Sequence, residues 1–93
     1  MYVTITGSEY YMGIESYKIG QLLLLKKDEE NRYDDEAIKV ETPSGALCGF
    51  VANSVDTVAR GTHSSGYIYS LINDSKQCEV KFILNNSVIA KIL

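Results

Sequence analysis

An alternating segment followed by a tight turn, within residues 31–51, most constrains what this chain can fold into. Apolar and polar residues alternate from Ile38 to Glu41, which is the period of a strand with one face toward a core. The next four residues, Thr42–Gly45, have the sequence Thr-Pro-Ser-Gly. Pro at the second position and Gly at the fourth suit a type I turn. The segment therefore predicts a β-hairpin in which residues 46–51 form the returning strand.

The polar residues before this hairpin predict a turn with an unusual aromatic side chain. Asn31 and Asp34 can hydrogen-bond the backbone about two residues further on. Tyr33 places a large ring between Arg32 and Asp34, where loop tips usually carry small polar side chains. Two interpretations stay open. Either Tyr33 folds back over the barrel edge while Asp34 caps the turn and Arg32 is solvated, or these three side chains form a small binding site.

The rest of the chain predicts further short strands. Residues 8–16 have no clean period and are expected to form a loop or irregular strand. Asn85-Asn86 tolerates positive φ and suits a primed two-residue hairpin turn. Strands are expected at Tyr2–Thr6, Tyr17–Lys27, Tyr67–Ile72, Gln77–Leu84 and Val88–Leu93. Within the fourth of these, one face is expected to carry Cys78, Val80, Phe82 and Leu84.

One short helix is expected after the hairpin. Asn53 or Ser54 would cap it, since their side-chain oxygens accept the free backbone N–H groups of a first turn. Gly61 would end it after about two turns. Its apolar face would carry Val55, Val58 and Ala59. The following Ser-rich segment holds the only histidine, His63, to which we assign no role.

Six or seven short strands, one small helix and hairpin connections predict a mostly β domain, a small OB-like or SH3-like barrel. The 93 residues suffice for one domain, residues 1–93, with a single core. The longest apolar run, Leu22–Leu25, is too short for a membrane span, and its four leucines fit a strand covered on both faces. No basic segment followed by an apolar one begins the sequence. We therefore expect a cytoplasmic protein with no membrane partner.

The cysteines and acidic residues give no sign of a metal site or a cofactor. Cys48 and Cys78 are far apart, without paired spacing, and are expected to be buried, reduced thiols. The acidic run Asp28-Glu29-Glu30 is expected to be a solvated connection. We expect no metal ion and no cofactor.

Three ordered blocks of residues lie at characteristic spacing. The central block is Asn31-x-Tyr33-Asp34-x-x-Ala37-Ile38-x-Val40, followed by Gly45-x-x-x-Gly49-Phe50-Val51. Upstream lie Thr6-Gly7-x-x-Tyr10-Tyr11-x-Gly13 and Gly20-x-x-Leu23-x-Leu25. A short expected helix after Val51 completes the set. Together, over residues 3–60, these blocks resemble the signature of HIRAN domains.

The resemblance implies recognition of the 3′ end of single-stranded DNA, as where the domain is fused to a remodelling helicase in replication-fork repair. Tyr10 or Tyr11 would sandwich the terminal base with Tyr33, each stack contributing about 1 to 3 kcal/mol. Asp34 would accept a hydrogen bond from the 3′-hydroxyl and repel a 3′-phosphate. Asn31 would hold the turn or bond a base edge. The candidate nucleic-acid-binding residues are Tyr10, Tyr11, Asn31, Arg32, Tyr33, Asp34, Phe50 and Asn53, the last beside helix N–H groups that would receive a phosphate.

Charge limits this binding. A net charge of −3 and a pI near 5.0 argue against a protein that coats duplex DNA, which needs many phosphate contacts. Glu9 and the run Asp28-Glu29-Glu30 would repel a polyanion. The compensating cations would be Arg32 with Lys26, Lys27 or Lys39. We therefore expect weak, salt-sensitive binding to single-stranded DNA ends.

The same residues also fit two other classes of function. In the first, the barrel is an adaptor without DNA binding, whose Tyr10, Tyr11 and Tyr33 contact a protein partner such as a helicase or nuclease. In the second, an enzyme holds Mg²⁺ with Asp34, Asp35 and Glu36. Neighbouring side chains on a strand point to opposite faces, and no Cys-His or Ser-His arrangement is evident. We therefore expect no catalytic residues.

Overall fold

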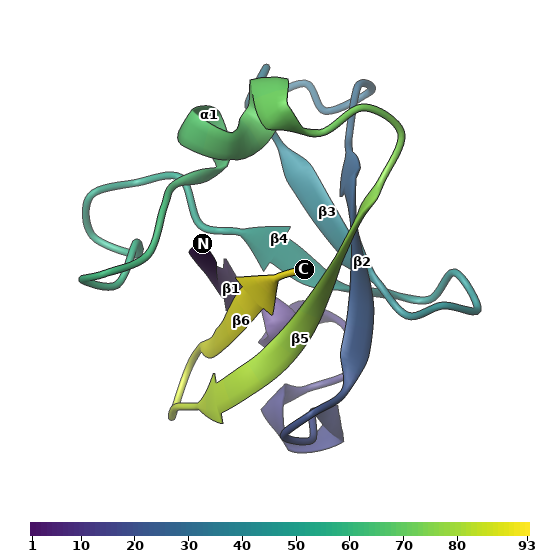
Figure 1. The fold of residues 1–93 in the computed structure, drawn as a ribbon, viewed down its shortest axis with the longest axis vertical. Coiled ribbons are helices and arrows are strands. Elements are labelled where there is room, and N and C mark those ends of the chain that lie inside the picture. Colours follow the sequence, from purple (N-terminus) through teal and green to yellow (C-terminus); the bar gives the residue numbers. More distant parts are fainter.

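Six antiparallel strands close into a barrel in the order β1-β4-β3-β2-β5-β6 (Figure 1). The computed structural model describes residues 1–93. The strands are β1 (Tyr2–Thr6), β2 (Leu22–Lys27), β3 (Ile38–Glu41), β4 (Leu47–Val51), β5 (Lys76–Ile83) and β6 (Val88–Ile92). The expected mostly β barrel is confirmed, with six strands and one short α-helix. No helix has the length and apolar character needed to cross a bilayer.

The hairpin predicted from the central segment is present as β3 and β4. Gly45 N–H donates to the carbonyl of Thr42 (2.9 Å), and Thr42 N–H donates to the carbonyl of Ala46 (2.9 Å). Gly45 adopts a φ of 97°, which L side chains rarely adopt. The strand register pairs Lys39 with Phe50. The hairpin predicted from alternation and the Thr-Pro-Ser-Gly turn is therefore confirmed.

The core lies inside the barrel and follows the period-two pattern. Leu23 and Leu25 of β2 are fully buried, whereas Leu22 is 42% exposed. The prediction that all four leucines are covered on both faces was therefore wrong. The fully buried side chains from the other strands include Val3, Ile5, Ile38, Val40, Val80 and Val88. Cys48 and Cys78 are buried and unpaired, as expected for structural thiols.

The segment from Tyr17 to Gln21 was expected to belong to β2, but it lies outside the strand. Two 3-10 helices precede β2, η1 (Ser8–Tyr10) and η2 (Ile14–Ser16). Gly20, with a φ of 88°, lies in the turn just before the strand begins. Residues 8–16, for which a loop or irregular strand was expected, therefore contain short helical turns.

The helix predicted after β4 is not formed. Thr57 and Val58 N–H groups both donate to the carbonyl of Ser54 (3.1 and 3.0 Å), which makes a single turn that does not continue. Val55, on the expected apolar face, is 96% exposed. The segment is instead tied to β1, because Thr4 Oγ1 accepts from Ala59 N–H (3.1 Å). With no apolar face to bury, the turn has little to gain from extending into a helix.

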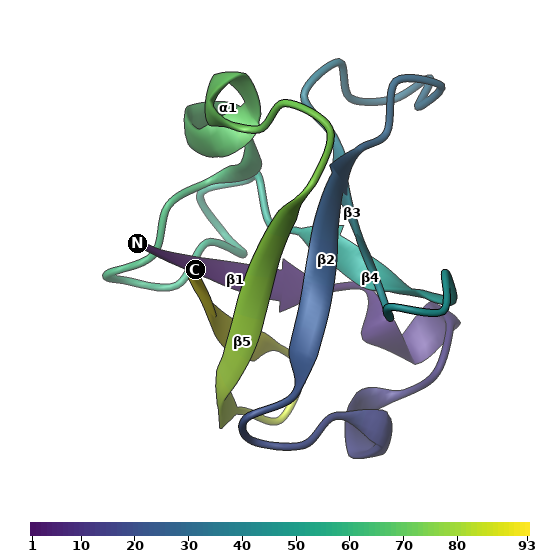
Figure 2. The same ribbon diagram turned by 45° about the vertical axis from the view of Figure 1, so that its right-hand side comes forward.

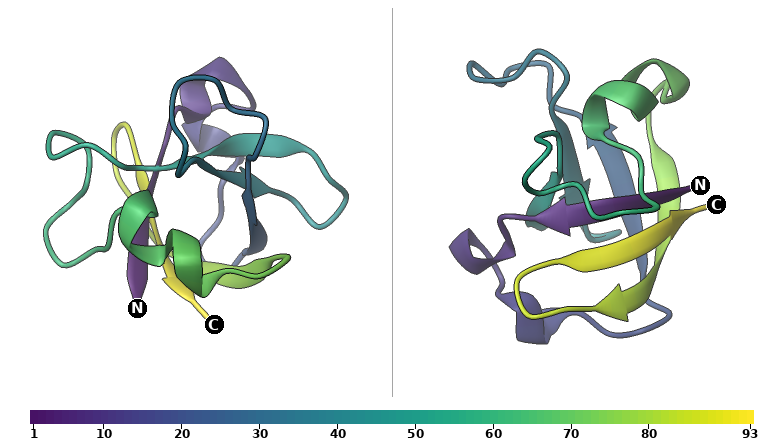
Figure 3. Two further views of the ribbon diagram at one scale, coloured as in Figure 1. Left: turned by 90° about the horizontal axis from the view of Figure 1, so that it is seen from above. Right: turned by 90° about the vertical axis from the view of Figure 1, so that its left-hand side faces the viewer.

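The helix lies later in the chain, where a strand was expected at Tyr67–Ile72. It comprises α1 (Ser65–Ile68) and the 3-10 helix η3 (Tyr69–Leu71), which cover one end of the barrel (Figures 1 and 3). Ser64 caps α1 by accepting from Tyr67 N–H (3.2 Å). Ile68 and Ile72 lie four residues apart and are both buried, which is a helical spacing.

The β5–β6 hairpin differs from its prediction in two respects. No non-glycine residue has a positive φ, so the primed turn at Asn85-Asn86 is wrong. The connection is closed instead by Leu84 N–H donating to the Ser87 carbonyl (2.8 Å). The strand register also shifts between Val80 and Phe82. This bulge adds one residue to β5, so Phe82 faces outward. Phe82 is 59% exposed and Leu84 is 49% exposed, whereas Cys78 and Val80 are buried.

Two connections lie on the same side of the barrel. The β2–β3 loop, residues 28–37, rises at the α1 end, whereas η1 lies beyond β4 toward the other end (Figures 1 and 2). Seen from above, the two overlap on one side (Figure 3, left). The candidate residues from these two connections therefore share a flank at different heights.

Candidate nucleic-acid interface

Asn31 fixes the shape of the β2–β3 loop. Its Oδ1 accepts from the backbone N–H groups of Tyr33 (2.9 Å) and Asp34 (3.0 Å). Its Nδ2 donates to Asp28 Oδ2 (3.3 Å). The Tyr33 side chain is 99% exposed and therefore contacts nothing else in the protein. The interpretation in which this ring folds back over the barrel edge is wrong.

Asp34 and Asn53 join three segments through side-chain hydrogen bonds, which we call the Asp34–Asn53 latch. Asp34 Oδ1 accepts from Glu36 N–H (2.9 Å), and Asp34 Oδ2 accepts from Asn53 Nδ2 (2.9 Å). Asn53 Oδ1 in turn accepts from Gly66 N–H (2.8 Å). Ser65 Oγ also donates to the Glu36 carbonyl, which ties α1 to the same loop. A carboxylate has about four acceptor positions, so Asp34 can accept further hydrogen bonds.

Asn53 does not have the two roles expected of it, capping a helix and lying beside helical N–H groups; it forms the hydrogen bonds of the latch instead. It caps no helix after β4, and no run of helical N–H groups lies there to receive a phosphate. Sequence reasoning placed Asn53 in the site but missed its hydrogen bonds, because its partners lie 19 and 13 residues away in the chain. The capping signal it missed is Ser64, three residues before Tyr67.

The second tyrosine-bearing segment is η1 with its neighbours. Tyr10 is 80% exposed, whereas the Tyr11 ring lies 6.2 Å from the ring of Phe50 on β4, tilted by 53°. The structure therefore brings Tyr11 and Phe50 together and leaves Tyr10 free. It does not bring Tyr33 into contact with either tyrosine of the pair, since Tyr33 is almost fully exposed.

A buried hydrogen-bonded pair anchors η1 to the barrel. The Tyr17 hydroxyl donates to the Cys48 carbonyl (3.2 Å) and shares a 2.8 Å hydrogen bond with Ser8 Oγ. Tyr17 is 5% exposed and Ser8 is 1% exposed. Burial raises the pKa of Tyr17 to about 12, although the hydrogen bond with Ser8 opposes this shift. The phenol is therefore neutral and able to donate at ordinary pH.

Replacing Tyr17 with phenylalanine should lower the free energy of unfolding by about 1–2 kcal/mol, because the Cys48 carbonyl and Ser8 hydroxyl lose a buried partner. The usual pKa of tyrosine is 10.0, so the contribution of Tyr17 is complete below about pH 10 and is lost as pH rises through about 12. Urea unfolding of both proteins at pH 8 and pH 11 checks this. Between these pH values the variant should lose less stability than the wild type. Part of the alkaline loss should remain in the variant, because burial also raises the pKa of Cys78 to about 12. An equal alkaline loss in both proteins would contradict the assignment.

Most cations near the site are already engaged. Lys26 and Lys39 contact the Glu41 carboxylate at 3.1 and 3.5 Å. Burial acts to raise the pKa of Glu41, but the hydrogen bonds and charges of the two lysines outweigh it and lower that pKa. Lys27 Nζ lies 4.5 Å from the ring centre of Tyr69. Arg32 is exposed and forms no ion pair, so it is the cation most free to meet a phosphate.

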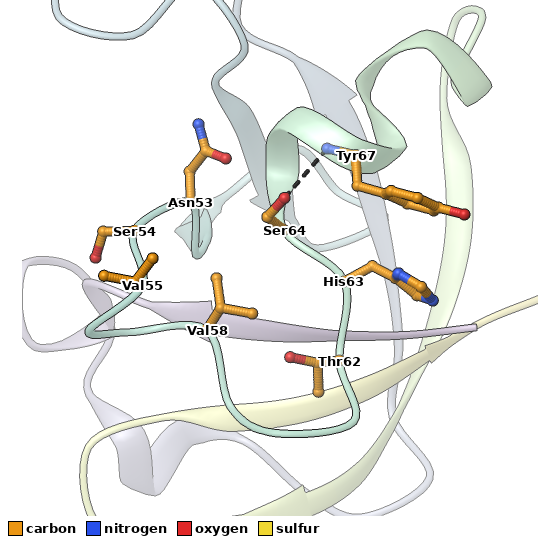
Figure 4. A pocket seen from close by; sticks show the side chains of 8 residues that line it. All are labelled: Asn53, Ser54, Val55, Val58, Thr62, His63, Ser64 and Tyr67. Carbon is orange, nitrogen blue, oxygen red and sulfur yellow. Dashed lines mark hydrogen bonds between the residues drawn. The ribbon is translucent and has the colours of Figure 1, made fainter.

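A hollow of about 460 Å³ lies beside Asn53, between the segment after β4 and the segment leading into α1 (Figure 4). No carboxylate lines it. At its far side His63 and Tyr67 stack with ring centres 4.3 Å apart, and both rings point away from Asn53. His63 therefore has an aromatic partner four residues on, which sequence reasoning missed. No three His, Cys, Asp or Glu side chains gather as metal ligands do.

Comparison with known proteins agrees with this fold. The HIRAN domain family model matches residues 1–87. A crystal structure of a protein from Lactobacillus plantarum superposes with a TM-score of 0.65 at 19% identity, covering 98% of this chain and 87% of that one. The crystal structure of the HIRAN domain of human HLTF also gives a TM-score of 0.65 at 19% identity, covering 99% of this chain and 73% of that one. No curated protein matches this sequence significantly. The match over residues 1–87 shows that the chain belongs to the HIRAN domain family, whose members are generally nucleic-acid-binding modules.

Proposed function

We propose that this domain binds the free 3′ end of single-stranded DNA in a repair or replication context. The terminal base stacks on Tyr33, and the 3′-hydroxyl donates a hydrogen bond to Asp34. The observation that carries the proposal is a tyrosine ring that is 99% exposed, next in sequence to a carboxylate whose position two hydrogen bonds fix.

The β2–β3 loop supports stacking because it is held in place before any ligand arrives. Asn31 fixes the backbone on both sides of the Tyr33 ring, and the latch fixes the next residue. A preorganised loop loses less conformational entropy on binding than a mobile one. A base that stacks on an exposed ring recovers about 1 to 3 kcal/mol without regard to its identity.

In this proposal the second tyrosine that stacks on a DNA base is Tyr10 rather than Tyr11. Tyr11 packs near Phe50, which holds its ring against β4, whereas Tyr10 is 80% exposed. Both tyrosine-bearing segments lie on one flank, with β4 between them (Figure 2). The DNA strand would therefore run along this flank, with its terminal base on Tyr33 at the β2–β3 loop and a base further from the end on Tyr10.

Asp34 gives the proposed preference for a free hydroxyl. Its two occupied positions leave acceptor capacity for one more donor. A 3′-phosphate or a continuing strand would instead bring anionic oxygen against the carboxylate. The attraction of the protein for DNA phosphates should be small, because Lys26 and Lys39 already form ion pairs with Glu41. Arg32, which forms no ion pair, is the cation available to a phosphate. With about one or two phosphate contacts, the slope of log affinity against log salt should be about −1.

Linear and circular forms of one short single-stranded oligonucleotide test this proposal. The circular form has the same bases and phosphates but no end, so the linear form should bind at least about fivefold more tightly. Competition against a 5′-labelled linear strand, in EDTA and at two salt concentrations, measures the ratio. Equal competition by both forms would contradict end recognition while leaving general single-strand binding intact.

A further inference from the structure

An apolar groove lies on the outer face of β1, β6 and β5, across the barrel from β3. Its volume is about 380 Å³, and three of its lining side chains are Tyr2, Ile89 and Phe82, one from each of these strands. Leu84 extends this side just after β5, and residues 59–62 form the opposite wall. In the barrel order β6 and β3 are separated by two strands on either side, so this face is distinct from the flank that carries Tyr33.

The wall opposite Phe82 is preformed by hydrogen bonds to β1. Thr4 Oγ1 accepts from Ala59 N–H (3.1 Å) and lies 2.8 Å from Thr62 Oγ1. Thr62 Oγ1 also donates to the Ala59 carbonyl (2.6 Å). These bonds close a short loop whose tip is Arg60 and Gly61. The groove is therefore a fixed feature between a strand face and a braced loop.

Several of the side chains that line the groove are apolar and exposed to solvent. Phe82 is 59% exposed, Leu84 is 49% exposed and Tyr2 is 37% exposed. The bulge after Val80 is what turns Phe82 outward instead of into the core. Exposed apolar side chains that lie together are a feature of protein interaction surfaces.

Arg60 is the one charged residue that lines the groove, although the chain as a whole carries a net charge of −3. Arg60 and Lys91 are exposed, and neither forms an ion pair. No carboxylate lines the groove. Glu79 on β5, which pairs in register with Lys91, forms an ion pair with Lys81 at 3.1 Å. An apolar groove beside an arginine that forms no ion pair is complementary to an apolar segment that carries a negative charge.

We propose that this groove docks an acidic, apolar segment of a partner protein, which inserts one or two large apolar side chains beside Phe82 and places a carboxylate on Arg60. The segment cannot add as a further strand, because every strand of the closed barrel already has two neighbours. A second copy of this chain is disfavoured, because a two-fold contact would bring the Arg60 and Lys91 charges of both copies together. A DNA backbone would find few cations and an apolar floor.

The minimal probe for this surface is N-acetyl-L-phenylalanine, which has one apolar ring and one carboxylate. Its neutral amide, N-acetyl-L-phenylalaninamide, is the matched control. Titration of the isotope-labelled protein should shift the backbone amide resonances of residues 59–62, Phe82 and Ile89. The carboxylate form should bind about threefold more tightly than the amide, the effect of one exposed ion pair.

Two variants separate the charge from the apolar floor. Arg60→Gln should bring the two probes to equal affinity, and Phe82→Ser should weaken both. Both sites are exposed, so both variants should fold. Lys76→Gln, an exposed lysine at the other end of β5, should retain the threefold preference, and so should Tyr33→Ala, since the groove is independent of the DNA site. Shifts that fall outside the groove, equal binding of the two probes to wild type, or a dimer in sedimentation equilibrium would overturn the proposal.

Discussion

Tyr33→Ala is expected to lower the affinity for a free single-stranded 3′ end by about tenfold or more, because one base-stacking ring contributes about 1 to 3 kcal/mol. The same substitution should leave the unfolding midpoint unchanged, since the ring is 99% exposed and loses no protein contact. Anisotropy of a 5′-labelled oligonucleotide measures the affinity, and thermal unfolding measures the midpoint. A large loss of binding without a loss of stability would show that the ring acts on the ligand.

Two companion variants make this result specific. Tyr33→Phe keeps the aromatic face and should bind within about twofold of wild type, because stacking does not use the hydroxyl. Tyr67→Ala removes a tyrosine that is 58% exposed on α1 and should also retain binding. If Tyr33→Ala bound the oligonucleotide as tightly as wild type, the β2–β3 loop would not be the binding surface.

Gly49→Ala is expected to lower the free energy of unfolding by about 2–3 kcal/mol, a typical cost of forcing atoms into a well-packed site. A Cβ at this position would lie 2.6 Å from the Thr6 backbone carbonyl oxygen and 3.1 Å from Ser8 Oγ. The first of these atoms is backbone at the end of β1, so the strand itself would have to move. The start of η1 would move with it, so the position of Tyr10 should change as well. Urea unfolding measures the stability loss.

Gly66→Ala is the matched control for Gly49→Ala. A Cβ there would approach Glu36 Oε1 at 2.7 Å and Asn53 Oδ1 at 3.2 Å, but both atoms belong to side chains rather than to backbone, and the closer one is the end of a flexible side chain. Glu36 can move away, so the cost should stay below about 1 kcal/mol. If Gly49→Ala were as mild as this control, the close approach of β4 to the end of β1 would not constrain the fold.

The parts of the fold that local chemistry determines could be predicted from the sequence. The β3–β4 hairpin rests on alternation and on a Pro-Gly turn, both readable over a dozen residues. The segment Tyr67–Ile72, for which a strand was expected, is short and contains two tyrosines and two isoleucines, residue types that favour strands. Its buried pair, Ile68 and Ile72, has helical spacing, and the Ser64 cap lies outside the segment considered. Short apolar runs of this kind fit both periods, so packing against the barrel end decides between them.

The outward turn of Phe82 shows a second limit of pattern reasoning. Strict alternation places Phe82 on the same face as Cys78 and Val80, but the bulge moves Phe82 to the opposite, outer face. A bulge depends on how β5 pairs with β6, which no local pattern in β5 reveals. The groove on the outer face of the barrel therefore could not be found before the register was known.

In the candidate site, too, only contacts between residues close in the sequence could be predicted. The turn role of Asn31 was predictable, because its partners are two and three residues away. The pairing of Asp34 with Asn53 was not, since it joins residues 19 apart through the closure of the barrel. The choice between Tyr10 and Tyr11 likewise depends on Phe50, a neighbour only in the folded chain.

The most direct measurement of the central claim is the ratio of affinities for one oligonucleotide with a 3′-hydroxyl and with a 3′-phosphate. The Asp34 carboxylate should favour the hydroxyl end by at least about fivefold at low salt, because it accepts one proton donor and repels the phosphate. Asp34→Asn removes the negative charge, so the ratio should fall toward one. Equal affinity of wild type for both ends would contradict recognition of the free 3′-hydroxyl by Asp34.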